Sequence, residues 1–182
     1  MEEILHIDNL FDALDSKDDK VRYPAFQELL KITEQQVTWI YDKWFLLTDK
    51  LSSDNSFQRS IGLMLLANLC KSDTEHRFLE LLDRYLDFFE DEKFITSRQC
   101  IQNVWKIAIV HPLYQKKIVE ELESSFFDNK NPHVNLIKQD IISSLHQIYL
   151  NTNNEEIKLK INELIESEND AKLVKSLKKL VV

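Results

Sequence analysis

The sequence predicts an all-α protein made of short antiparallel helices. Apolar residues recur at helical spacing over almost the whole chain, as in Phe78, Leu81 and Tyr85, which would share one face of a helix. Only one glycine and three prolines occur in 182 residues, too few for the many turns of a β-sandwich or barrel. The joints between the apolar stripes are short, so consecutive helices should be antiparallel neighbours.

Polar clusters between the stripes set the predicted helix boundaries. Residues 52–55, 72–74 and 151–154 are rich in Ser, Thr, Asp and Asn, whose side chains cap helix N-termini. Asn131 followed by Pro132 predicts a cap and a first helical residue, and Pro112 should end a helix that runs through Ile109. In order, the predicted helices cover residues 2–15, 20–33, 35–51, 55–71, 74–90, 94–110, 113–128, 132–150, 155–167 and 170–181.

A basic residue recurs early in the second helix of each predicted pair. Arg22, Arg59, Arg98 and Lys138 are 37, 39 and 40 residues apart. A small residue follows the first two of them, Ala25 and Gly62 respectively, and an apolar residue and a leucine come after it. Gly62 lies inside a predicted helix, where glycine costs about 1 kcal/mol relative to alanine. We therefore expect the paired helices to approach closely at this position.

This pattern resembles the HEAT family of helical repeats and the related armadillo repeats. The resemblance implies a right-handed α-solenoid of about five antiparallel helix pairs, forming one domain over residues 1–182. The approximate pairs are 1–33, 34–71, 72–111, 112–151 and 152–182. The resemblance also implies that first helices lie on the convex side and that second helices line the concave face. It further implies that the protein is a scaffold for other macromolecules.

The charges are sorted by helix. The predicted first helices sum to about −17 and the second helices to about +9, within a net charge of −8, so a concave face made of second helices would attract an acidic partner. We therefore expect a non-catalytic scaffold that binds an acidic or extended protein segment in the concave groove. The expected contact residues are Arg22, Arg59, Arg98, Gln99, Gln102, Lys106, Lys138 and Gln139. The alternative is an internal ladder, in which the basic residues pair with acids at the joints such as Asp19, Asp54 and Asp91.

The last segment of the chain alternates leucine and valine with lysine. Lys172, Lys175, Lys178 and Lys179 fall between apolar residues of one predicted helix. This pattern favours an end cap with a charged outer face, and docking of a partner or of a membrane surface is the alternative.

No motif in the sequence predicts catalysis, a cofactor or a metal. The five histidines have no ligand spacing, and one glycine cannot build a phosphate-binding loop. The alternative function comes from fold analogy alone: some HEAT-like proteins are alkylpurine DNA glycosylases, and Trp105, Arg98 and Asp140 would take the Trp, Arg and Asp roles of those enzymes. The net charge of −8 favours a protein partner over nucleic acid, and nothing points to a small-molecule substrate.

The N-terminal residues, the apolar stretches and the cysteines predict a cytoplasmic protein. The first ten residues are acidic and lack the basic start of a secretory signal. The longest mostly apolar stretch, residues 61–70, is half the length of a membrane span. Cys70 and Cys100 lie in segments that read as buried helix, which favours two reduced thiols over a disulfide.

Overall fold

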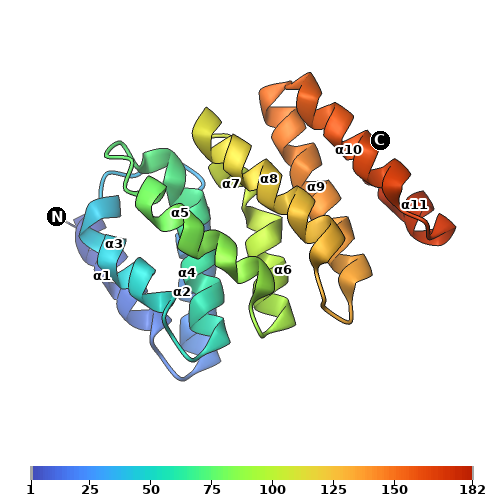
Figure 1. Ribbon diagram of the computed structural model, residues 1–182. Coiled ribbons are helices and arrows are strands. Elements are labelled where there is room, and N and C mark those ends of the chain that lie inside the picture. The colour runs from blue at the N-terminus through green and yellow to red at the C-terminus, as the bar shows by residue number, and fades with distance from the viewer. Residues whose placement is uncertain (1, 182) are drawn as a thin grey trace. The chain divides into compact units, whose positions relative to one another are not determined.

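The protein is all-helical in a computed structural model that describes residues 2–181 (Figure 1). Within that range there are α-helices and two 3-10 helices, and no strand. The prediction of an all-α fold is therefore confirmed. The chain forms two compact units, Met1–Glu75 and His76–Val182, and the boundary lies close to the predicted junction between residues 34–71 and 72–111. Whether the chain is a single domain stays a prediction.

The first unit contains two helix pairs. Its helices are α1 (Glu2–Leu14), α2 (Asp19–Ile32), α3 (Ile40–Lys50) and α4 (Ser56–Leu69), followed by the 3-10 helix η1 (Cys70–Ser72). The helices α1 and α2 pack as one pair, α3 and α4 as the next, and α2 also packs on α4. Side chains join α1 to α3, where the rings of Phe11 and Trp39 meet edge to face at 5.7 Å.

Gly62 lies where α4 meets α3. A Cβ built on this residue would lie 3.1 Å from the carbonyl oxygen of Leu47, from Cβ of Lys50 and from Cδ2 of Leu51. These distances are shorter than ordinary van der Waals contact, so the two helices are as close as the absence of a side chain allows. The expectation of close helix approach at Gly62 is confirmed.

The second unit continues the alternation of helices. It contains α5 (Phe78–Leu86), the 3-10 helix η2 (Asp87–Glu90), α6 (Phe94–Asn103), α7 (Trp105–Ala108), α8 (Pro112–Asp128), α9 (Val134–Thr152), α10 (Glu155–Ser167) and α11 (Ala171–Lys178). The first helices α5, α8 and α10 pack on one another in that order. The second helices do the same, α6 on α9 and α9 on α11.

Several helix boundaries differ from the prediction. The third helix begins at Ile40 rather than at residue 35, because Gln36 Nε2 donates to the Lys71 carbonyl (3.0 Å) and the backbone N–H of Val37 donates to Ser72 Oγ (3.0 Å). Residues 36–37 therefore bond to η1 instead of starting a helix. The fifth helix begins at Phe78 rather than at residue 74.

The predicted cap at Asn131 is also wrong by two residues. The Asn131 side chain accepts the backbone N–H of His133 (2.9 Å) in a turn that includes Pro132, and α9 begins only at Val134. By contrast, the capping clusters predicted at residues 52–55 and 151–154 are confirmed, because the side chains of Asn55 and Asn154 each accept the N–H two residues on, at 3.0 Å.

Candidate functional site

The predicted site residues divide between the second helices of the two units. Arg22 and Arg59 lie on α2 and α4 in the first unit. In the second unit the other six lie on α6, α7 and α9, and they are Arg98, Gln99, Gln102, Lys106, Lys138 and Gln139. Two of the eight residues therefore belong to the first unit and six to the second.

Arg22 is held by its own joint and by an aromatic ring. Its Nη2 pairs with Asp19 Oδ1 and its Nη1 donates to the Ser16 carbonyl at 3.1 Å. The guanidinium lies 5.6 Å from the ring centroid of Phe57 on α4, within range of a cation–π interaction. The side chain is mostly covered, and only part of the guanidinium remains available to a ligand.

Arg59 is a structural residue, which removes it from the predicted contact set. It is only 8% exposed, and its Nη1 donates to the carbonyls of Ser53 (2.9 Å) and Asp54 (3.1 Å) in the α3–α4 joint. Loop carbonyls buried under a helix must be satisfied, and the arginine provides the donors. These two bonds place the guanidinium at the joint and go to backbone carbonyls, so pairing with the Asp54 carboxylate stays a prediction.

Arg98 and Gln102 converge on the buried carboxylate of Asp140. The Arg98 guanidinium donates from Nε to Oδ2 (2.6 Å) and from Nη2 to Oδ1 (3.0 Å), and Gln102 Nε2 donates to Oδ1 at 2.8 Å. The hydrogen bond to Asp140 is the main cause that raises the pKa of Arg98. This bidentate contact joins α6 to α9, so Arg98 pairs with the next helix pair rather than with the joint acid Asp91.

Three other residues of the predicted contact set, Gln99, Lys106 and Gln139, are half-buried. Lys106 Nζ donates to Asn103 Oδ1 at 2.7 Å and lies 5.9 Å from the Trp105 ring. The Gln99 Oε1 atom is buried without a hydrogen-bond partner. Gln139 is half-buried on α9. Of the three glutamines in the predicted contact set, Gln102 is exposed and the other two are half-buried.

Lys138 is bound by an acid from the end of α10. Its Nζ lies 2.6 Å from Glu168 Oε2 and 4.7 Å from the Phe126 ring centroid. The pKa of Glu168 is lowered, first by the backbone N–H of Asp170 and then by Lys138. The charge of Lys138 is neutralised inside the fold.

The lysines of α11 and its C-cap residue Lys179, together called the α11 lysines, differ from these paired residues. Lys172, Lys175, Lys178 and Lys179 are exposed, whereas Leu173 and Leu177 are buried where α11 packs on α9 and α10. Among residues 76–181, no carboxylate oxygen lies within 4.0 Å of these four ammonium groups. Sequence reasoning included these lysines in the charge of the second helices but assigned the segment to an end cap.

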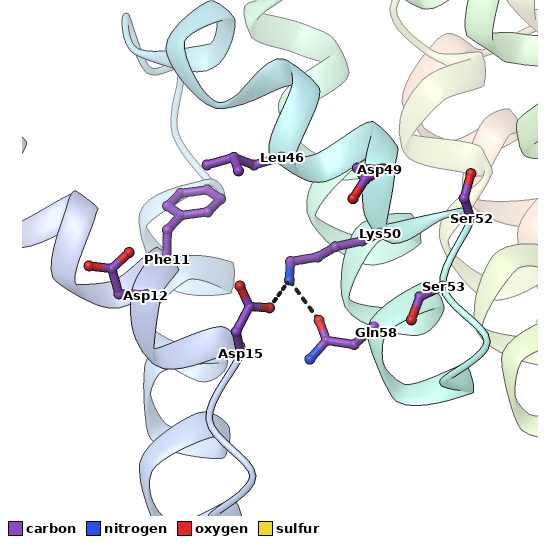
Figure 2. A pocket seen from close by; sticks show the side chains of 9 residues that line it. All are labelled: Phe11, Asp12, Asp15, Leu46, Asp49, Lys50, Ser52, Ser53 and Gln58. Atoms are coloured by element: carbon purple, nitrogen blue, oxygen red, sulfur yellow. Dashed lines mark hydrogen bonds and ion pairs between the residues drawn. The ribbon is translucent and has the colours of Figure 1, made fainter.

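A pocket between α1 and α3 contains a buried lysine that the sequence analysis missed. Figure 2 shows Lys50 reaching from α3 to Asp15 and Gln58, and its Nζ lies 2.7 Å from Asp15 Oδ1 and 2.6 Å from Gln58 Oε1. Gln58 Nε2 in turn donates to the Leu14 carbonyl at 2.8 Å. The lysine thus ties α1, α3 and α4 together. Its position three residues after the buried Leu47 is a signal that could have identified it.

That pocket has a volume of about 290 Å³ and carries more acid than base. Its other lining residues are Phe11, Asp12, Leu46, Asp49, Ser52 and Ser53. The three aspartates surround one lysine that already has two partners, so the arrangement is explained by packing of the helix ends.

The residues proposed for a glycosylase are arranged differently from an open catalytic site. Asp140 is buried and already accepts three N–H groups, two of them from Arg98. An acid that acts on a substrate must be able to reach it, so this geometry gives the analogy no support.

His76 and His111 have ring centroids 5.9 Å apart, yet the described residues contain no group of three potential metal ligands.

Both cysteines are buried with free thiols. Burial raises the pKa of Cys70 and of Cys100 well above the ordinary thiol value, which favours the protonated thiol over the nucleophilic thiolate.

Comparison with known proteins adds no family to this description. No protein-family model and no curated protein matches the chain. Over the part of the chain that the structure describes, no helix combines the length and the apolar character that crossing a membrane requires.

Proposed function

We propose that this protein is a non-catalytic scaffold of HEAT-like repeats, a right-handed α-solenoid whose second helices bind an acidic, extended protein segment. The order of packing within each unit supports the repeat. Second helices contact second helices, α2 with α4 and α6 with α9, and first helices contact first helices. Stacking of equivalent helices is the packing principle of helical solenoids.

The proposal of an acidic partner rests on the α11 lysines, for which no carboxylate partner is found within the second unit. Arg22, Arg98 and Lys138 each have a carboxylate partner within the fold, so they offer a ligand little free positive charge. The four α11 lysines have none among residues 76–181. An acidic segment lying along α11 would therefore pair with four ammonium groups without first displacing an internal acid.

Charge and burial favour a protein over the other anionic partners. The chain as a whole carries −8, which opposes the dense phosphates of nucleic acid. The apolar side of α11 is occupied, because Leu173 and Leu177 are buried, so this helix has no apolar face to insert into a bilayer.

Charge reversal on α11 tests this proposal. Lys172→Glu, Lys175→Glu and Lys179→Glu are combined in the full chain, and binding of a fluorescent ten-residue polyglutamate peptide is followed by anisotropy at 50 and 200 mM salt. We expect the triple variant to bind at least about tenfold more weakly, and the parent to lose affinity as salt rises, because exposed charges are screened.

The matched control reverses three exposed lysines elsewhere in the same unit, Lys93, Lys116 and Lys130. It changes the net charge equally, so an equal loss in both variants would show that only total charge matters and would reject α11 as the site. A parallel assay measures base release from alkylated duplex DNA. Release of base by the parent protein would replace the scaffold with the glycosylase alternative.

A further inference from the structure

A second pocket, separate from the α11 lysines, lies between α2 and α4 in the first unit. Its volume is about 280 Å³, and it is lined by Asp19, Arg22, Tyr23, Phe26, Phe57, Ser60 and Ile61. Tyr23 is 62% exposed and Phe57 is 67% exposed. Two large aromatic side chains left in water beside an apolar hollow are typical of an interaction site.

The size and the walls of the pocket fit one aromatic ring. A closed apolar cavity of about 150 Å³ is enough to hold benzene, so an open hollow of about 280 Å³ accommodates a single substituted ring. Phe57 is held in place by the guanidinium of Arg22, 5.6 Å from its ring centroid. A ring entering beside Phe57 would gain aromatic contacts as well as burial.

The mouth of the pocket selects for a neutral polar group. Asp19 and Arg22 form an ion pair there, so the two charges cancel. An anionic ligand would face the Asp19 carboxylate, and a cationic ligand would face the Arg22 guanidinium. A phenol hydroxyl both donates and accepts, and it therefore complements the carboxylate and the guanidinium together.

We propose that this pocket binds a tyrosine side chain presented by an extended segment of a partner protein. The ring lies against Phe26, Phe57 and Ile61, and the hydroxyl meets Asp19 and Arg22 at the mouth. The exposed surfaces of Tyr23 and Phe57 extend the contact beyond the pocket, where the chain on either side of the tyrosine lies. Tyrosine anchors in such pockets carry much of the binding energy of protein interfaces. This site does not depend on the lysines of α11.

Selection of peptides tests the site on the full chain. Random linear twelve-residue peptides displayed on phage are selected against the protein, and the tightest is synthesised with its tyrosine intact, as phenylalanine and as alanine. We expect a shared tyrosine among the selected peptides. Replacement by phenylalanine should weaken binding about fivefold, which is the loss of one net hydrogen bond, and replacement by alanine at least about tenfold.

Variants of the protein locate the binding. Tyr23→Ser combined with Phe57→Ser should weaken peptide binding at least about tenfold. The matched control is Phe45→Ser, which removes a 76% exposed aromatic side chain of α3 outside the pocket, and it should bind like the parent. If the double variant does not fold by circular dichroism, Tyr23→Ser alone, which leaves the contact between Arg22 and Phe57 intact, replaces it.

Three results would overturn the proposal. The first is a set of selected peptides without a common tyrosine, and the second is parental affinity in the pocket variant. The third is p-cresol binding as tightly as the selected peptide, which would assign the pocket to a small aromatic molecule instead of a protein segment.

Discussion

Removing the Asp140 carboxylate should destabilise the second unit more than any other single polar substitution on α6 or α9. Asp140→Ala deletes an acceptor of three hydrogen bonds, at 2.6, 2.8 and 3.0 Å. Removing one partner of a fully buried ion pair costs about 3–5 kcal/mol. The Arg98 side chain is 26% exposed and can turn partly to water, so we expect a loss of about 2–3 kcal/mol.

A double-mutant cycle measures the coupling directly. Urea unfolding followed by circular dichroism gives the free energy of unfolding for Asp140→Ala, Arg98→Ala and the double variant. We expect the double variant to be more stable than the sum of the single losses implies, with a coupling energy above about 1.5 kcal/mol. The reason is that, without Arg98, Asp140 would be a buried negative charge with no cation beside it and only the Gln102 amide as a donor.

The exposed pair Lys116–Glu120, whose charged atoms are 4.0 Å apart on one helix, is the matched control. Its coupling should be only a few tenths of a kcal/mol. If the coupling of Arg98 with Asp140 is no larger than this, the argument that burial strengthens the pair is refuted.

Three further predictions concern packing, acid stability and thiol reactivity. Gly62→Ala should lower the free energy of unfolding by about 1 kcal/mol despite better helix propensity, because the new methyl group meets a backbone carbonyl of α3 at 3.1 Å; a raised melting temperature would contradict this. Because the pKa of Glu168 is lowered in the folded protein, its ionised carboxylate contributes its full share to the free energy of unfolding above the unfolded pKa of about 4.3. That contribution is lost as the pH falls through the lower folded pKa. Glu168→Gln should therefore be less stable than the parent at pH 7, and in thermal melts the difference should shrink as the pH falls below the unfolded pKa of about 4.3, whereas a constant difference would argue against linkage. Cys70 and Cys100 should not react with a thiol reagent at pH 8 until the chain unfolds, because burial keeps both protonated; fast labelling of the folded protein would disprove this.

Much of the fold could be predicted because helical periodicity is a local property. The buried set of α5, which includes Phe78, Leu82 and Tyr85, follows the stripe read from the sequence. The start of the third helix was missed because the loop before it bonds to a distant segment, as Gln36 does with the Lys71 carbonyl 35 residues away. Sequence spacing does not contain such a contact.

The candidate site was harder to predict, because pairing between helices depends on packing. Periodicity placed Arg98 and Lys138 early in second helices, and the structure agrees. It could not show that Asp140 and Glu168 neutralise them, or that Arg59 is buried at its joint. The pocket on the first unit needs Tyr23 of α2 and Phe57 of α4 to be neighbours, and no local pattern indicates that.

The amino-acid sequence by itself determined that this chain is helical and where most of its apolar faces lie, since these follow from interactions among residues a few positions apart. Tertiary structure alone decided which positive charges remain available to a partner. A lysine or arginine is free only if no carboxylate packs against it, and the acids that pair with Arg98 and Lys138 come from positions 30 to 42 residues away.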